Sequence, residues 1–306
     1  MKYSPDQQTL LEQYVKKILA APVYDIAVRT PLQAAPALSE ALGNRILLKR
    51  EDLQPTFSFK IRGAYNKLVQ LSDAQKARGV ITASAGNHAQ GVALAARELG
   101  VAATIVMPST TPELKVLGVR SRGAEALLHG ESFPFALAHA LQLAEQTGRT
   151  FVSPFDDPEV IAGIAAYVKY LRPEVRIIGV ESEHSACLKA ALQADARVVL
   201  PSVGTFADGV AVAQIGAYGF EVCRFCVDEV VTVSNDELCA AIKNIYDDTR
   251  SITEPSGALA VAGIKQYVAR SGVREQTFVA VDSGANINFD SLRHVAERAA
   301  MCGVPA

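Results

Sequence analysis

Residues 80–91 read Val80-Ile81-Thr82-Ala83-Ser84-Ala85-Gly86-Asn87-His88-Ala89-Gln90-Gly91. The apolar residues at the start predict a short strand, and the pattern over 87–99 predicts a helix. Small and polar residues between a strand and a helix are typical of a turn at the carboxyl end of a parallel strand. Backbone N–H groups at such a helix start bind anions, here a carboxylate. Alternatively, Ser84 or Asn87 only satisfies free N–H groups of the helix.

The same alternation of strands and helices continues along most of the chain. Short apolar runs predict strands over residues 45–49, 80–82, 104–107, 125–128, 150–152, 175–180 and 278–281. Periodic patterns predict helices over residues 10–19, 60–71, 87–99, 112–121, 132–147, 160–171, 235–246 and 256–270. This order predicts an α/β fold with mainly parallel sheets, whose ligands bind where strands lead into helices.

The composition excludes several classes of protein. The chain has 306 residues, 49% hydrophobic and 20% charged, which is too apolar for a disordered protein. Thirty Lys and Arg against 32 Asp and Glu leave a net charge of −2, so nucleic-acid binding is not expected. The longest uncharged apolar run, Gly257 to Ile264, is far shorter than the about 20 residues of a membrane helix. At about 150 residues per domain, the length predicts about two domains.

The five cysteines bear on compartment and on metal binding. Their odd number and irregular spacing argue against a disulfide framework, and the N-terminus has no apolar signal, so we expect a cytoplasmic protein. Cys223-Arg224-Phe225-Cys226 is a CxxC pair, but no second pair or neighbouring histidines complete a zinc site. We therefore expect no metal and interpret both cysteines as small buried residues near a helix end.

Three further turns contain candidate residues. Lys60 stands among apolar residues near a predicted helix start, where burial favours an uncharged, nucleophilic amine. A lysine that holds its ammonium group in water is the commoner state. Residues 254–258 lead into a helix, and in 282–286 the hydroxyl of Ser283 follows a strand and is placed to meet a ring nitrogen. Ordinary helix-start and turn signals also explain both segments.

Taken together and in this order, the four segments resemble the signatures of one family. They are similar to pyridoxal 5'-phosphate (PLP) enzymes of the tryptophan-synthase-β fold, also called fold type II, and within it to threonine dehydratase (threonine ammonia-lyase) of the biosynthetic type. The resemblance runs from about residue 21 to about residue 298 and includes residues 48–52, 185–191 and 208–212. It implies a large PLP-binding domain of residues 1–81 and 155–306 and a small domain of residues 82–154.

The resemblance also implies a role for each matching residue. Lys60 would hold the cofactor covalently and shuttle the Cα proton, Phe59 would lie against the ring, Asn87 would bind the ring hydroxyl, and Ser283 would bind the ring nitrogen. The turn that receives the substrate carboxylate would comprise Ser84, Ala85, Gly86, Asn87 and His88. The expected reaction is β-elimination from L-threonine, giving 2-oxobutanoate and ammonia for isoleucine biosynthesis. A homo-oligomer is expected, with neither nucleic acid nor membrane as a partner.

The sequence departs from the family at two places. The family carries a run of glycines that grips the cofactor phosphate through backbone N–H groups at a helix start, and residues 156–181 contain no such run. Two helix portions are joined near residues 161–164, so about 25–35 family residues are missing there. We interpret this as an in-frame deletion that threatens cofactor affinity. The biosynthetic branch also continues into a regulatory domain, which we do not expect here.

Two alternatives stay open at this point. The missing phosphate loop favours an impaired or inactive relative that only folds or pairs with intact subunits, whereas the retained Lys60, Asn87 and Ser283 oppose that reading. The motifs do not fix the preferred side chain of the substrate, so a serine dehydratase or racemase of the same class is the second alternative.

Overall fold

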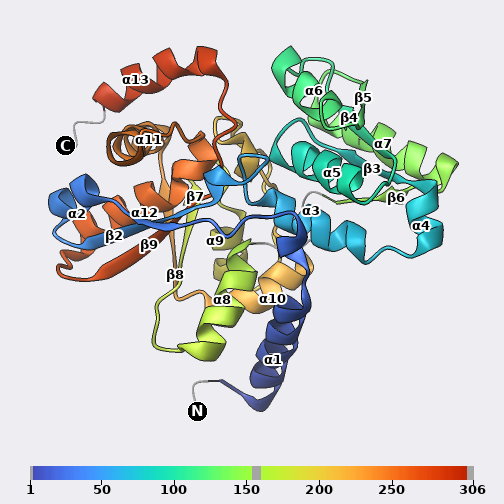
Figure 1. The fold of residues 1–306 in the computed structure, drawn as a ribbon. Helices are drawn as coiled ribbons and strands as arrows, with labels where there is room; N and C mark the ends of the chain where they lie inside the picture. The colour runs from blue at the N-terminus through green and yellow to red at the C-terminus, as the bar shows by residue number, and fades with distance from the viewer. Residues whose placement is uncertain (1–2, 154–159, 302–306) are drawn as a thin grey trace. The chain divides into compact units, whose positions relative to one another are not determined.

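The computed structural model describes residues 3–153 and 160–301 (Figure 1). The chain forms two compact units, which we describe separately. Unit 1 comprises Met1–Ala21, Thr30–Asp52 and Pro158–Ala306, and unit 2 comprises Pro22–Arg29 and Leu53–Asp157.

Unit 2 is built on a four-stranded parallel sheet in the order β5-β4-β3-β6. Its strands are β3 (Val80–Ala83), β4 (Ala103–Met107), β5 (Glu125–Leu128) and β6 (Thr150–Phe151). Its helices are α3 (Lys60–Val69), α4 (Asp73–Arg78), α5 (Asn87–Glu98), α6 (Glu113–Arg120), α7 (Phe133–Thr147) and the short η1 (Val23–Asp25). Val80 packs into a cluster with α3, α5 and α6, whereas Ile81 packs into one with α7. Both faces of the sheet are thus covered, so β3 and β4 consist of buried residues.

Unit 1 contains two further sheets. Strand β1 (Leu32–Ala34) pairs antiparallel with β2 (Arg45–Arg50), which pairs parallel with β9 (Thr277–Asp282). Strand β7 (Ile178–Ser182) pairs parallel with β8 (Glu229–Val233). The helices are α1 (Pro5–Ala20), α2 (Pro36–Leu42), α8 (Val160–Leu171), α9 (Cys187–Ala194), α10 (Ala217–Cys226), α11 (Asn235–Thr249), α12 (Pro255–Ser271) and α13 (Leu292–Met301). Short 3-10 turns are η2 (Glu51–Leu53), η3 (Asp208–Val210) and η4 (Phe289–Ser291).

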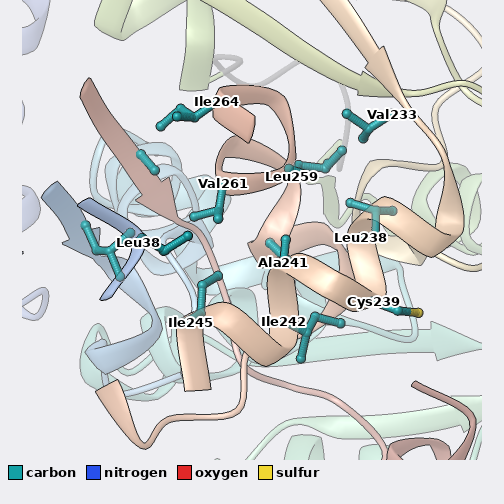
Figure 2. Packing of buried hydrophobic residues seen from close by; sticks show 14 of the residues in the cluster. Leu38, Val233, Leu238, Cys239, Ala241, Ile242, Ile245, Leu259, Val261 and Ile264 are labelled. Atoms are coloured by element: carbon teal, nitrogen blue, oxygen red, sulfur yellow. The ribbon is translucent and has the colours of Figure 1, made fainter. Parts of the chain in front are cut away.

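The largest core of unit 1 forms around α11 and α12. Figure 2 shows Ala241, Ile242 and Ile245 of α11 beside Leu259 and Val261 of α12. Side chains from β2, β8 and β9 join the same cluster, so these two helices cover both sheets of the unit. A capping box at Ser234, whose hydroxyl accepts from the Glu237 N–H, fixes the start of α11.

The predicted elements are present, and the fold class is confirmed. The predicted strand over 175–180 begins later, at Ile178, and the elements β1, β8, α2, α4, α9, α10 and α13 were not predicted. The two units differ from the expected division, since residues 22–29 and 53–81 lie in unit 2, where α3 shares a core with β3 and α5. Cys223 and Cys226 are fully buried in the last turn of α10, which confirms their structural interpretation. No described helix combines the length and apolar character needed to span a bilayer.

Candidate active site

Lys60 is the first residue of α3 in unit 2. Phe59 precedes it as a half-buried N-cap residue that offers no side-chain acceptor, and Ser58 is fully buried. The N–H of Lys60 donates to the Ser58 hydroxyl at 3.4 Å, which fixes the entry into the helix. Phe57 is exposed and has a φ of 55°, an uncommon conformation for an aromatic residue and one that is concentrated at functional sites. The Lys60 side chain is half-buried, as a reactive amine requires both access and partial desolvation.

Helix α5 packs closely against the backbone of Lys60. A Cβ atom at Gly91 would lie 3.1 Å from the carbonyl oxygen of Lys60 and 3.3 Å from the nitrogen of Ile61. A glycine at this position therefore lets the two helices approach, and the start of α3 is held against α5. The sequence alone gives Gly91 no role, because only the tertiary contact with Lys60 shows why a glycine stands there.

Ser84 organises the turn between β3 and α5. Its hydroxyl accepts from the N–H groups of Gly86 at 3.2 Å and Ala89 at 3.3 Å, and its own N–H donates to the carbonyl of Val106. The side chain thus satisfies free N–H groups at the helix start, the structural role considered above. A Cβ atom at Gly86 would meet no atom within 4 Å, so the turn faces open space there. Ala85 is half-buried against the unit 2 core, and Asn87 is 7% exposed.

His88 is a buried, neutral histidine. Burial and the nearby charge of Lys60 lower its pKa to about 3, although a contact of its Nε2 with the Val152 carbonyl at 3.4 Å acts in the opposite direction. The imidazole is therefore uncharged at pH 7, with Nε2 placed to donate to that carbonyl. The influence of the Lys60 charge on this pKa means that His88 lies near the lysine within unit 2. A neutral His88 supplies no positive charge for a carboxylate.

Ser283 lies in unit 1, directly after β9. Its hydroxyl donates to the carbonyl of Ser256, in the first turn of α12, at 3.3 Å. The Ser256 Oγ is buried and has no hydrogen-bond partner among the described residues, and a Cβ atom at Gly209 would lie 2.7 Å from it. The third and fourth predicted turns, residues 254–258 and 282–286, are therefore neighbours within unit 1.

A buried ionic network beneath Ser283 was not predicted. Asp282 is fully buried and accepts from the Thr253 hydroxyl at 2.6 Å, while its Oδ2 lies 3.8 Å from Nε of Arg50 and accepts no hydrogen bond from the described residues. Arg50 forms a two-bond ion pair with Asp52, at 2.9 and 2.6 Å. Burial, and then the charge of Asp52, raise the pKa of Asp282 to about 7. The sequence signal that could have indicated this network is the acidic residue Asp282 at the carboxyl end of a predicted strand.

The predicted site residues divide between the two units. Unit 2 holds Phe59, Lys60 and the 84–88 turn, and unit 1 holds Ser283. An open cavity of about 400 Å³ in unit 1, lined by residues 183–184, 186 and 200–204, includes no predicted site residue. The described residues contain no cluster of His, Cys, Asp and Glu suited to a metal ion.

A family model described as "Pyridoxal-phosphate dependent enzyme" matches residues 23–163 and again residues 159–284. The chain belongs to this family. The biosynthetic L-threonine dehydratase of Burkholderia multivorans is 52% identical over 320 residues, which cover 94% of this chain and 63% of the relative. The chain spans about 63% of the length of that relative.

Solved structures also match this chain. The processed form of threonine deaminase isoform 2 from Solanum lycopersicum is 43% identical, with a TM-score of 0.94 over 98% of this chain and 90% of the tomato chain. Maize serine racemase is 27% identical, with a TM-score of 0.82 over 94% of this chain and 97% of the maize chain. The fold is therefore fold type II of the PLP enzymes.

The alignment with the Burkholderia multivorans relative is longer than the part of this chain that it covers. Ninety-four per cent of 306 residues is about 288, so about 32 of the 320 positions face no residue of this chain. The two matches of the family model meet at residues 159–163, at the start of α8.

The residues present suit one part of the family cofactor, pyridoxal 5'-phosphate. An amine at Lys60 suits its aldehyde, and the hydroxyl of Ser283 and the unpartnered Oγ of Ser256 suit a polar ring. For the phosphate, the described residues around α8 offer one glycine, Gly163, instead of a glycine-rich turn. Each unit thus holds residue types that suit a part of the cofactor, and the described residues around α8 do not include a glycine-rich turn.

Proposed function

We propose that this chain deaminates L-threonine to 2-oxobutanoate and ammonia by β-elimination, with pyridoxal phosphate as its cofactor. The observation that carries the proposal is the 52% identity to the Burkholderia multivorans threonine dehydratase, in a chain that retains Lys60, Asn87 and Ser283. When bound, the cofactor supplies an electron sink that makes the substrate Cα proton acidic.

The chain's own residues would bind, orient and move protons. The Lys60 amine would hold the cofactor covalently and then carry the Cα proton, and its place against Gly91 would fix its approach. The 84–88 turn would receive the substrate carboxylate through N–H and amide donors, since His88 is neutral. Ser283 would meet the ring nitrogen through a hydroxyl, which holds a proton there less strongly than a carboxylate and so favours elimination.

We also propose that the phosphate grip is reduced because a segment is missing before α8. The about 32 unmatched positions and the split of the family match at residues 159–163 support this reading. Charge-assisted hydrogen bonds contribute about 1.5–3 kcal/mol each, so the loss of two corresponds to about 100-fold or more in affinity. The same observations favour an impaired relative that pairs with intact subunits as the second candidate.

A serine-specific lyase or racemase is the third candidate. The likeness to maize serine racemase favours it, because the same fold there acts on serine according to that protein's name. A homo-oligomer and a cytoplasmic location remain proposals. The location is supported by buried, unbridged cysteines at positions 187, 223, 226 and 239.

The test uses Lys60→Ala and, as a matched control in the same helix, Lys67→Ala. Titration of the purified chain with pyridoxal phosphate should produce an absorption band at about 410–420 nm that Lys60→Ala abolishes and Lys67→Ala retains. Release of 2-oxobutanoate from threonine and of pyruvate from serine then identifies the substrate. No band at saturating cofactor would reject catalysis and support the impaired relative.

A further inference from the structure

The hydroxyl of Thr253 lies between two oxygens of the turn that follows β9. Its Oγ1 is 2.6 Å from the Oδ1 of Asp282 and 2.6 Å from the carbonyl oxygen of Gly284. Both distances are at the short end of the range for O–H···O hydrogen bonds, so a proton belongs in each contact. A threonine hydroxyl carries one proton, and a carbonyl carries none. This hydroxyl alone therefore cannot make both hydrogen bonds with two acceptors.

A protonated Asp282 supplies the second proton. When its carboxyl is ionised, it accepts from Thr253, and the Gly284 carbonyl then faces the same hydroxyl oxygen without a proton between them. When the carboxyl is neutral, its O–H donates to Thr253, and Thr253 donates to Gly284. Asp282 and Thr253 are both fully buried, so bulk water does not reach the pair to supply a proton instead. The geometry thus favours the neutral carboxyl.

The charges that face Asp282 favour the same state. Its Oδ2 lies 3.8 Å from Nε of Arg50, but Arg50 already forms two hydrogen bonds with the carboxylate of Asp52. An ionised Asp282 would add a second buried negative charge beside this single cation, and buried Glu254, at the N-cap of α12, repels that charge as well. Burial, and then Asp52, raise the pKa of Asp282 to about 7, although the Thr253 hydrogen bond and Arg50 act in the opposite direction.

The same hydroxyl ties the turn after β9 to the start of α12. The Gly284 carbonyl accepts from Thr253 and also from the N–H of Glu254, at 3.0 Å. A Cβ atom at Gly257 would collide with the Thr253 hydroxyl and with the Gly284 oxygen, so the backbone of α12 packs directly on this pair. Loss of the proton on Asp282 would turn the Thr253 hydroxyl toward the carboxylate and remove one of the two bonds to Gly284.

Ser283 lies between the two residues that this network holds. Asp282 precedes it and Gly284 follows it, and its own hydroxyl donates to the Ser256 carbonyl at 3.3 Å, which is long for a hydroxyl donor. A hydroxyl held so loosely is directed mainly by its backbone. Movement of Gly284 relative to α12 would therefore change where the Ser283 hydroxyl points.

We propose that Asp282 is a positioning residue for Ser283: its neutral carboxyl, through Thr253, fixes the turn that presents the Ser283 hydroxyl to the cofactor ring. The contact of Ser283 with the ring nitrogen rests on the proposed function, whereas the proton on Asp282 is a property of the cofactor-free chain. As the pH rises through the pKa of Asp282, at about 7, the carboxyl ionises and the turn loosens. The ring is therefore bound most tightly when Asp282 is neutral.

The first test detects the proton in the cofactor-free chain. Infrared difference spectra between the parent and Asp282→Asn, at about pH 5.5 and about pH 8.5, should show the C=O stretch of a protonated carboxyl only at the lower pH. Glu181, whose pKa burial also raises, contributes to both chains and cancels in the difference. Asp290→Asn makes the same change at an exposed position of unit 1 and should leave this signal in place.

The second test follows the turn through hydrogen exchange of the Glu254 amide, relative to that of Ile245 in the core of α11. In the parent, protection should fall by about threefold to tenfold between about pH 6 and about pH 8.5, the effect of one lost hydrogen bond. Asp282→Asn keeps an uncharged donor toward Thr253 and should stay protected at both pH values. Thr253→Val removes the bridge and should be weakly protected at both, whereas Thr277→Val, at the exposed start of β9, should behave as the parent.

The third test measures the affinity for pyridoxal through the band at about 410–420 nm. The ratio of the Kd of the parent to that of Asp282→Asn cancels the pH dependence of Lys60, which both chains share. This ratio should be near one at about pH 6 and rise by about threefold to tenfold at about pH 8.5. Ser283→Ala in both chains should hold the ratio near one, because no hydroxyl is then left to position.

These measurements separate this proposal from the proposed function. Absence of the band from every chain would count against the proposed function, and the infrared and exchange results would still decide the role of Asp282. The proposal would be overturned by infrared spectra without a protonated carboxyl at Asp282, by Glu254 protection that does not change with pH, or by a Kd ratio that rises equally without the Ser283 hydroxyl. Circular dichroism verifies that each variant folds, and the results for Asp282→Asn do not depend on Thr253→Val.

Discussion

Gly91→Ala tests whether α5 holds the start of α3 and hence Lys60. The added Cβ would lie 3.1 Å from the Lys60 carbonyl oxygen and 3.2 Å from its carbonyl carbon. These are backbone atoms that cannot rotate away, so the two helices must separate by a few tenths of an ångström. Overpacking of this kind costs about 1–3 kcal/mol, whereas alanine in place of glycine within a helix gains about 0.5–1 kcal/mol. We expect a net loss of up to about 2.5 kcal/mol.

Gly63→Ala is the matched control, because it makes the same substitution inside α3. A Cβ at Gly63 would meet no atom within 4 Å, so only the helix gain remains. One kcal/mol shifts the melting temperature of a domain of 150–250 residues by about 2–4 °C. Gly63→Ala should therefore melt about 1–4 °C above the parent chain, and Gly91→Ala should melt at or below the parent.

The same two variants also test whether the contact at Gly91 positions Lys60 for its reaction with pyridoxal. The band at about 410–420 nm that forms with pyridoxal should be weaker in Gly91→Ala than in Gly63→Ala, since the first variant displaces the backbone of Lys60. If Gly91→Ala raised the melting temperature as much as Gly63→Ala and left the band unchanged, the close contact between α5 and α3 would not position Lys60, and the reasoning would be wrong.

Three further predictions follow from individual contacts. Because burial raises the pKa of Asp282 from 3.8 to about 7, the folded state binds this proton more tightly than the unfolded state; the resulting stability is complete below about pH 3.8 and is lost as the pH rises through 7. Asp282→Asn should flatten this decline in urea unfolding between pH 4 and pH 8. Ser84→Ala should cost about 1 kcal/mol, seen as a lower melting temperature, because the hydroxyl accepts from Gly86 and Ala89; an unchanged melting temperature would exclude this capping role. Pyridoxal and pyridoxal phosphate should bind within about tenfold of one another, measured by titration of the band, because a phosphate grip of two charge-assisted bonds would separate them by about 100-fold.

Local patterns were sufficient for most of the helices and strands. The helix over residues 160–171 was predicted with its observed bounds, because its apolar spacing is regular and its ends are not in competition with another pattern. Strand β8 and helix α10 were missed, since β8 reads as a short apolar run between charged residues and α10 is bounded by weak signals. The placement of residues 22–29 and 53–81 in unit 2 does not follow from sequence order, which does not reveal that α3 shares a core with α5.

The sequence by itself determined the α/β class, the family and the residue types of the candidate site, because strand–turn–helix chemistry and the four motifs are local properties. Only the tertiary structure decided that Gly91 fixes the backbone of Lys60, that His88 is neutral, and that Asp282 lies in a buried network with Arg50. These properties depend on burial and on distances between segments far apart along the chain. The strand order of each sheet belongs to the same group, since strand pairing is a property of the assembled sheet.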